Sequence, residues 1–145
     1  ELVVVVSNPV ELGVALFSRA IGRERVIGIG GYQDTMRFRR ELAADLGIRR
    51  QRVGAFMLGE HGAAQVPIWS SVRIHGLGDD DTARAVAGLR RRIGDVPFAR
   101  RCREARAQLD ALMGAERFAE AFARVEELPA DVRVVLRPFI THRSG

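Results

Sequence analysis

The 145-residue sequence contains very little cysteine and no lysine at all. Its single cysteine, Cys102, excludes an internal disulfide. This composition fits a reducing compartment, so we expect a cytoplasmic protein. No apolar run approaches the roughly 18–20 residues that a membrane-spanning helix needs, and we therefore expect no membrane partner.

Because lysine is absent, all 23 basic residues are arginine, and the net charge is +5. A basic chain can bind nucleic acid. The exclusive use of arginine, however, points to a coding bias rather than to selection for phosphate contacts. The densest basic run, LRRRIGDVPFARRCREAR, carries apolar residues at helical spacing and is typical of a solvated helix face. We therefore expect no nucleic-acid partner.

The two ends of the sequence are abrupt. Glu1 already lies in an expected strand, and the sequence stops at Gly145 without a closing element. We interpret the sequence as an internal segment of a longer protein. Hydrophobic residues make up 47% of it, which is enough for a core of ordinary size.

Hydrophobic patterning in the first third predicts alternating strands and helices. The run ELVVVVSNP is apolar until its final turn residues, as in a strand buried on both faces of a parallel sheet. A helical repeat over 10–22 ends at Gly22, a short strand over 25–31 follows, and a helix over 32–48 ends at Gly47. This order of elements predicts a parallel α/β sheet.

The remainder is predicted to begin with two strands and to continue as helices. RVGAFMLG and PIWSSVRIHG are typical of antiparallel strands that flank a histidine loop. Helical periodicity then indicates helices over 80–93, 97–113 and 115–127. The final stretch, 131–140, alternates in hydropathy and is predicted to be a strand.

Several polar residues are candidates for chemistry, but each has a simpler interpretation. Asp34 and Arg37 share one helix face, and their spacing alone favours a surface ion ladder that includes Glu41. His61 is a single histidine in a loop, and Asn8 is compatible with a plain turn. No histidines, cysteines or carboxylates have the spacing of metal ligands, so we expect no metal site.

A glycine pattern resembles a dinucleotide-binding turn only in part. Gly28, Gly30 and Gly31 lie between an expected strand and helix, but the third glycine of the fingerprint is replaced by Gln33. This pattern indicates a tight turn between strand and helix. The loop that would hold a pyrophosphate is absent from this sequence.

Three motifs occur in a fixed order: an Asn-Pro turn in SNPV, a D-x-x-R helix start in QDTMR, and a G-E-H-G loop in LGEHG. In this order and at these separations they closely resemble the middle of the lactate/malate dehydrogenase family. The likeness runs from about Leu2 to Gly76, and beyond Gly78 only the helical layout is similar.

The resemblance implies an α/β fold, with the end of a doubly wound parallel (Rossmann-type) sheet followed by a mixed α+β substrate domain. Residues 1–31 would form the C-terminal part of the NAD-binding domain, and residues 32–145 a truncated substrate domain. The cofactor would be NAD, and the full-length protein would be a homo-oligomer. On its own, this sequence is expected to be inactive, because it lacks the pyrophosphate loop.

The resemblance also implies roles for individual residues. His61 would be the general acid/base, and Asp34 would accept a hydrogen bond from its other ring nitrogen. Arg37 would bind the substrate carboxylate with two parallel hydrogen bonds. Asn8 would donate to the reacting oxygen, and Ser7 and Asn8 would border the cofactor.

The implied function is hydride transfer between NAD and an L-2-hydroxy acid. The segment VPIWS, with Trp69, is more similar to lactate than to malate enzymes; a malate dehydrogenase and a non-catalytic relative of the same fold are the alternatives. The family pattern further implies a cis peptide before Pro9. Two positions depart from the family. Glu11 stands where aspartate is usual, and Ala63 stands where an acidic residue is usual.

Overall fold

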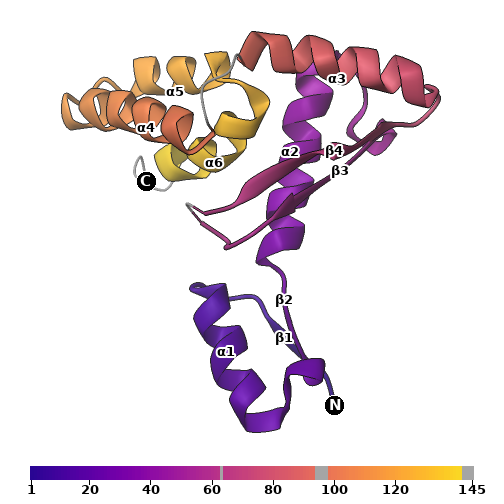
Figure 1. Ribbon diagram of the computed structural model, residues 1–145. Coiled ribbons are helices and arrows are strands. Elements are labelled where there is room, and N and C mark those ends of the chain that lie inside the picture. The colour runs from indigo at the N-terminus through magenta and orange to yellow at the C-terminus, as the bar shows by residue number, and fades with distance from the viewer. Residues whose placement is uncertain (63, 94–97, 142–145) are drawn as a thin grey trace.

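The computed structural model describes residues 1–62, 64–93 and 98–141 (Figure 1). A small unit of β1, α1 and β2 is joined through α2 to a hairpin and a group of helices. The predicted start of the fourth helix, at residue 97, and the departure at Ala63 lie outside the described residues. The elements are β1 (Val3–Val5), α1 (Val10–Ile21), β2 (Val26–Gly28), α2 (Gly30–Leu46), β3 (Val53–Leu58), β4 (Val66–Ile74), α3 (Asp79–Ile93), α4 (Phe98–Gly114), α5 (Phe118–Glu127) and α6 (Ala130–Thr141).

The N-terminal unit confirms the predicted parallel pairing. β1 pairs with β2 in parallel register, Val3 opposite Val26, and α1 forms the crossover between them. The helix packs closely on the second strand: a Cβ added at Gly28 would lie 2.7 Å from the Val10 side chain.

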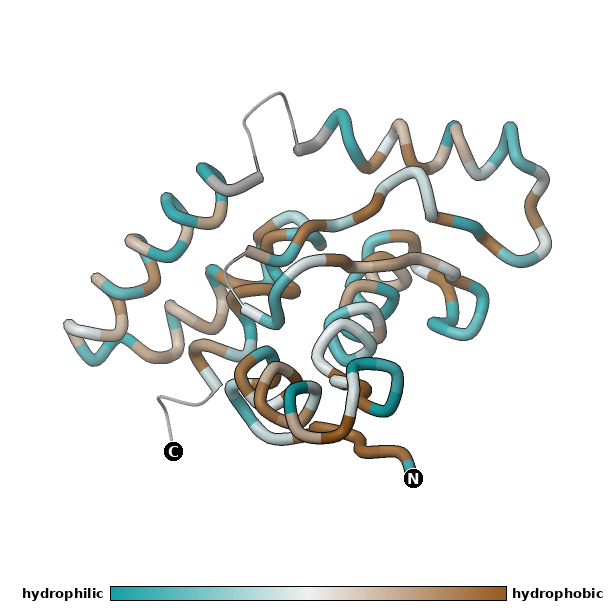
Figure 2. The backbone as a smooth tube through the Cα atoms, turned by 60° about the horizontal axis from the view of Figure 1, so that its bottom comes forward, coloured by the Kyte–Doolittle hydropathy of each residue, from teal (hydrophilic) through white to brown (hydrophobic). Residues whose placement is uncertain are grey.

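The expectation that the first strand is buried on both faces is wrong for the described residues. Val5 faces α1 and is 5% exposed, whereas Val4 is 49% exposed. The reason is that β1 has β2 as its one hydrogen-bonded neighbour within the described part, and α1 packs on one side of the pair. The hydropathy colouring in Figure 2 shows how apolar this N-terminal strand is.

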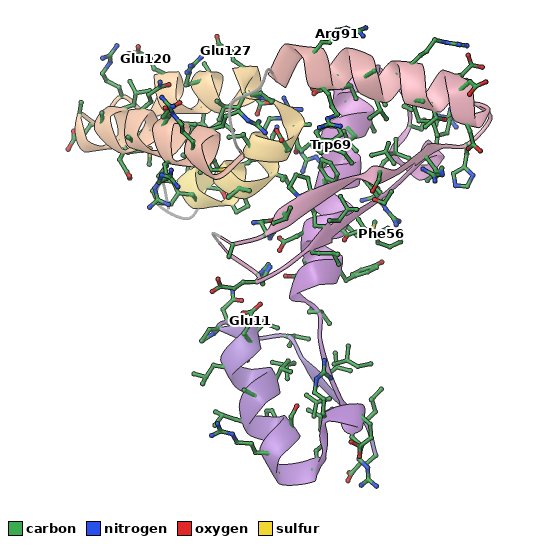
Figure 3. All side chains as sticks on the ribbon, viewed as in Figure 1. Glu11, Phe56, Trp69, Arg91, Glu120 and Glu127 are labelled. Atoms are coloured by element: carbon green, nitrogen blue, oxygen red, sulfur yellow. The ribbon has the colours of Figure 1, made fainter. Side chains whose placement is uncertain are left out.

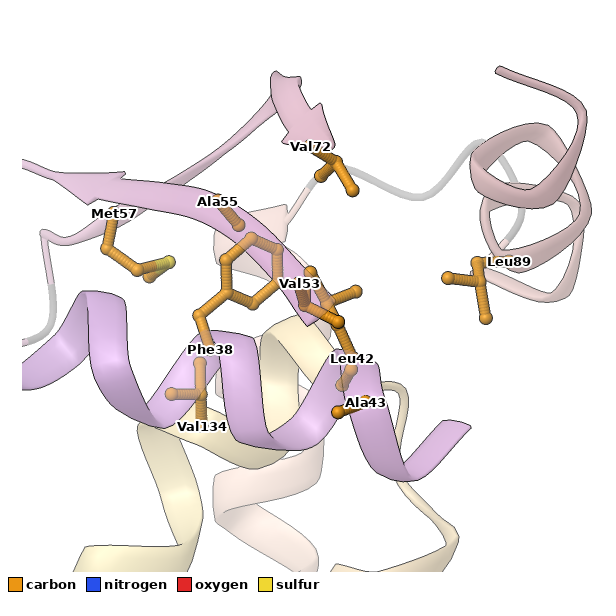
Figure 4. Close-up of a cluster of buried hydrophobic side chains, with 10 residues drawn as sticks. Phe38, Leu42, Ala43, Val53, Ala55, Met57, Val72, Leu89 and Val134 are labelled. Atoms are coloured by element: carbon orange, nitrogen blue, oxygen red, sulfur yellow. The ribbon is translucent and has the colours of Figure 1, made fainter. Parts of the chain in front are cut away.

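The second strand pair is the predicted antiparallel hairpin, and α2 packs along one of its faces (Figures 1 and 4). Phe38 and Leu42 on α2 are fully buried against β3 and β4. Trp69 on β4 meets the Phe38 ring edge-on, with the ring centroids 5.5 Å apart. The helix ends where Gly47 adopts a left-handed conformation, as the sequence predicts. This packing fixes the face of α2 that carries Asp34 and Arg37.

The C-terminal helices form a separate cluster, and here the sequence-based prediction of a final strand is wrong. Residues 130–141 form the helix α6, not a strand. Val132, Leu136 and Ile140 lie on the side packed against α4 and α5, while Val134 packs on the cluster around α2. A helix buried on two sides has apolar residues around most of its circumference, so its helical periodicity is hidden and its β-branched residues imitate a strand.

Buried charges join α6 to α2. The Arg133 guanidinium on α6 donates to the Glu41 carboxylate and, over 2.8 Å, to Asp45. Both Glu41 and Arg133 have side chains that are about 95% buried (4% and 6% exposed). Helix α6 is therefore held on α2 by paired charges as well as by apolar contacts, and it covers α2 next to Arg37. Within the described residues, no helix is both long and apolar enough to cross a membrane.

Candidate functional site

The centre of the candidate site is a contact between a loop histidine and a buried carboxylate. His61 lies in the loop between β3 and β4, and its Nδ1 is 2.7 Å from Oδ2 of Asp34 on the first turns of α2. The Asp34 side chain is 3% exposed and that of His61 is 11% exposed. A buried carboxylate on Nδ1 fixes the ring orientation and leaves Nε2 as the nitrogen available for proton transfer.

Arg37 completes a three-residue arrangement on the same helix face. Its Nη1 donates to Oδ1 of Asp34 over 3.2 Å, so Asp34 bridges the histidine and the arginine. Part of the surface-ladder interpretation is therefore correct, since Asp34 and Arg37 do pair. Glu41, however, is engaged with Arg133 and Arg137 instead of Arg37, and Asp34 is buried. The predicted ion ladder of Asp34, Arg37 and Glu41 is therefore not formed.

Two contacts from other elements fix the backbone of the histidine loop. The His61 backbone N–H donates to Oε1 of Glu11, with 2.5 Å between the nitrogen and the oxygen. Figure 3 shows Glu11 at the end of α1 nearest the hairpin. A Cβ added at Gly30, the first residue of α2, would lie 2.5 Å from the Cβ of His61, so only glycine permits this approach. The loop is thus held by both the N-terminal unit and α2.

The hydrogen bond to His61 lowers the pKa of the Glu11 carboxyl below its ordinary value of 4.5. The main cause of this lowered pKa is the hydrogen bond that the His61 backbone N–H donates, because it stabilises the charged carboxylate. Glu11 is the position where the family usually has aspartate. The additional methylene of glutamate still allows the carboxylate to reach the histidine loop.

A cavity of about 240 Å³ opens beside these residues, and we call it the site cavity. Asp34, Arg37 and His61 line one side of it, Arg106 on α4 is a further cation in its wall, and α6 supplies apolar residues. Sequence reasoning did not find Arg106 or the α6 wall, since both reach the cavity through helix packing that has no local signal in the sequence.

Asn8 and Ser7 are exposed residues just before α1 and do not line the site cavity. Asn8 therefore does not share this cavity with Arg37, and its predicted role toward the reacting oxygen stays a prediction. The peptide bond between Asn8 and Pro9 is cis, as the family resemblance implies. The histidine loop reaches the same end of α1 through Glu11, which follows Pro9 by two residues.

Two glycines of the partial dinucleotide pattern lie in close contacts within the chain. Gly28 approaches the Val10 side chain, and Gly30 approaches that of His61. This agrees with the interpretation of the glycine pattern as a tight turn. No group of three or more histidine, cysteine, aspartate or glutamate residues in the described part could hold a metal ion.

Comparisons with known proteins find relatives for part of the chain. No protein-family model matches it. L-lactate dehydrogenase 2 of Listeria monocytogenes serotype 4b (strain F2365) is 54% identical over 54 residues, which cover 37% of this chain and 17% of that protein. Malate dehydrogenase of Syntrophotalea carbinolica is 36% identical over 109 residues, which cover 66% of this chain and 34% of that protein. The chain thus spans about a third or less of the length of these relatives.

A solved structure is similar as well. The crystal structure of Cryptosporidium parvum malate dehydrogenase matches 56% of this chain and 26% of its own, with 32% sequence identity and a TM-score of 0.51. The sequence relatives and this structure confirm the resemblance drawn from the three motifs, and they confirm the fold class, a fragment of a Rossmann-type fold. The chain is consistent with a partial member of the lactate/malate dehydrogenase family.

Proposed function

We propose that the full-length protein transfers a hydride between NAD and an L-2-hydroxy acid, with His61 as the general acid/base. The observation that carries this proposal is the Asp34 carboxylate, which is buried and contacts both His61 and Arg37. A surface ion ladder pairs carboxylates with arginines and does not involve a histidine. An acid/base centre beside a carboxylate-binding cation requires a histidine in contact with that carboxylate.

The proton transfer follows from the geometry. In the oxidative direction, Nε2 of His61 removes the hydroxyl proton of the substrate as the hydride leaves the same carbon. The imidazolium that forms donates from Nδ1 to Asp34, whose negative charge lies 2.7 Å away and stabilises it. In the reductive direction the imidazolium returns the proton to the oxygen of the 2-keto acid. NAD, when bound, accepts or supplies the hydride.

Arg37 is proposed to bind the substrate carboxylate. Its Nη1 is used by Asp34, its side chain is 42% exposed, and it lines the site cavity, so the rest of the guanidinium can face a ligand. A planar guanidinium can donate two parallel hydrogen bonds to a carboxylate, which an ammonium group cannot copy. Asn8 is proposed to donate to the reacting oxygen, and Ser7 and Asn8 to border the nicotinamide.

Between substrates, we propose lactate/pyruvate over malate/oxaloacetate, on the similarity of VPIWS to lactate enzymes. Trp69 supports this only as a family feature, because its ring packs on Phe38 and does not line the site cavity. The relatives include enzymes of both names. We further propose a cytoplasmic homo-oligomer.

We also propose that residues 1–145 alone do not turn over substrate. The sequence has Gln33 where the dinucleotide fingerprint has its third glycine, so we expect no pyrophosphate loop to hold the nicotinamide against the substrate carbon. Loss of such positioning forfeits up to ~7–11 kcal/mol of rate acceleration.

The test is a spectrophotometric assay of NADH formation by the full-length protein with lactate and, separately, malate. Activity should disappear in His61→Gln and persist in His75→Gln, a matched change at an exposed histidine outside the site cavity. Equal activity of both variants would exclude the proposed role of His61. An inactive wild type that still binds NAD and a 2-keto acid would favour the non-catalytic relative.

A further inference from the structure

A second cavity lies between α2 and α6, next to the site cavity. Its volume is about 240 Å³, and its walls include Arg37, Arg40 and Arg137 together with Glu41. We call it the arginine pocket. Arg37 lines both cavities, so the proposed carboxylate-binding cation also borders this one.

The lining of the arginine pocket carries more positive than negative charge. Among the described residues that line it, Glu41 is the one carboxylate, and that group already accepts from the Arg133 guanidinium, which is buried elsewhere in the interface. Arg137 donates to Glu41 over 3.3 Å and to Glu126 over 2.8 Å from the same nitrogen, Nη2. Three guanidinium groups therefore border the cavity, and the Glu41 carboxylate in its described lining is shared with a fourth. Asp34 and Glu126, which do not line the cavity, occupy one nitrogen of Arg37 and of Arg137.

Two of the three arginines have donors without a protein acceptor. Arg40 is exposed, and it has no hydrogen-bond or ion-pair partner among the residues that the structure describes. Arg137 Nε is buried and has no hydrogen-bond partner in the same part of the chain. A buried donor without an acceptor is costly, and it is rare in folded proteins unless a ligand or ordered water completes it.

From this convergence we infer that the arginine pocket binds a phosphate-type oxyanion, either free or as the phosphoryl group of a small ester. The guanidinium groups of three arginines on two helices can donate to the three oxygens of a tetrahedral group, whereas a carboxylate offers only two oxygens. The doubly charged form also supplies an acceptor to Arg40, which has none among the described residues. The site is independent of the hydride chemistry, although an anion held at Arg37 competes with a substrate carboxylate if the proposed function holds.

The experiment is a calorimetric titration of the full chain with inorganic phosphate at an ionic strength kept constant with sodium chloride. We expect saturable binding that becomes about tenfold weaker in Arg40→Gln, the loss of one charge-assisted contact. Arg49→Gln is the matched control, an exposed arginine outside the pocket, and it should bind as the wild type does. A phosphate site elsewhere in the full-length protein would contribute equally to all three proteins and cancels in the comparison.

Two further ligands distinguish free phosphate from a phosphate ester, and a phosphoryl group from a dicarboxylate. Glycerol phosphate should bind about as well as inorganic phosphate if a phosphoryl group is sufficient, and much better binding of the ester would identify esters as the ligand. Malonate, a dicarboxylate of the same charge, should bind more weakly. Equal affinities of Arg40→Gln and Arg49→Gln, or of malonate and phosphate, would overturn the assignment. Because no substrate or NAD is present, neither result depends on dehydrogenase activity.

Discussion

The Glu11 carboxylate accepts a hydrogen bond from the His61 backbone, and the two residues are fifty positions apart. Glu11 lies in the first turn of α1 in the N-terminal unit, and His61 lies in the hairpin loop that packs on α2. This contact therefore connects the part of the chain that carries Asn8 and Ser7 with the proposed acid/base. The position of the histidine depends on both units.

The first prediction follows from the lowered pKa of Glu11. A carboxyl whose folded-state pKa lies below its unfolded value contributes stability at pH values above the unfolded pKa, and that contribution is lost as pH falls through the folded pKa. We expect the His61 loop to open, measured by amide exchange at His61, as the pH falls below 4.5. In Glu11→Gln this pH dependence should vanish, whereas Glu24→Gln, at an exposed glutamate, should retain it. A loop that opens at the same pH in both variants would contradict the role of Glu11.

The second prediction concerns the orientation of the imidazole. Asp34→Asn keeps the size of the side chain but can present its N–H₂ group to His61, which favours the wrong tautomer. We expect kcat to fall by about 10²–10⁴-fold. The ring nitrogen shifts of His61, measured by NMR, should change at the same time. Asp80→Asn on α3 is the control at an exposed carboxylate. A fall in kcat with an unchanged His61 tautomer would show that Asp34 acts in another way.

The third prediction concerns Arg37. Replacing it by lysine retains the charge but removes the planar pair of donors, so the loss should appear in both KM and kcat, about 2–4 kcal/mol in kcat/KM. Steady-state kinetics of Arg37→Lys and of the control Arg49→Lys provide the measurement. Unchanged kinetics in Arg37→Lys would argue against a substrate that carries a carboxylate.

The sequence predicts the first half of the fold because the signals there are local. Glycines end α1 and α2 at the expected positions, and the alternation in β3 and β4 matches a hairpin with one buried face. In α6 the prediction fails because this helix packs between α2 and the other C-terminal helices. Its contacts with α2 involve residues about ninety positions apart, such as Arg133 and Glu41, and no local pattern encodes such a pair.

The candidate site could be predicted only in part for the same reason. Spacing alone favours a surface ladder for Asp34 and Arg37, and only the resemblance to a family brings His61 to Asp34. The contact of Glu11 with His61 and the presence of Arg106 in the site cavity come from tertiary packing. The burial of Asp34 distinguishes a carboxylate that orients a histidine from a member of a surface ladder, and this burial depends on the whole fold.

The fourth prediction concerns Cys102 on α4. Burial raises the pKa of its thiol to about 11 from an ordinary value of 9.0, and the negative charge of Asp131 adds to the shift. Since the thiolate is the reactive form, alkylation by iodoacetamide at pH 8 should be roughly a hundredfold slower than that of an unperturbed thiol. Mass spectrometry of the Cys102 peptide gives the rate, and denaturant should restore it. A fast reaction in the folded protein would show that the C-terminal helix cluster does not bury this thiol.

The last prediction tests whether α6 is held on α2 by its buried charges. Arg133→Met leaves the Glu41 carboxylate buried with only the longer contact to Arg137, and breaking such a pair costs about 3–5 kcal/mol of unfolding free energy. The matched control is Arg124→Met, which breaks a surface ion pair with Glu127 and should cost less than about 1 kcal/mol. Urea denaturation of the full chain, monitored at a probe in α6, measures both.

The double variant Arg133→Met, Glu41→Leu separates pairing from simple loss of a side chain. It removes both charges, so most of the stability lost in Arg133→Met should return even though the ion pair is still absent. Because Glu41 is on the helix that carries Asp34 and Arg37, loosening α6 in Arg133→Met should also open the site cavity and raise the exchange rate of the amides along α2. If Arg133→Met is no less stable than Arg124→Met, the charges do not hold α6 in place, and the apolar contacts of α6 must position the wall of the cavity.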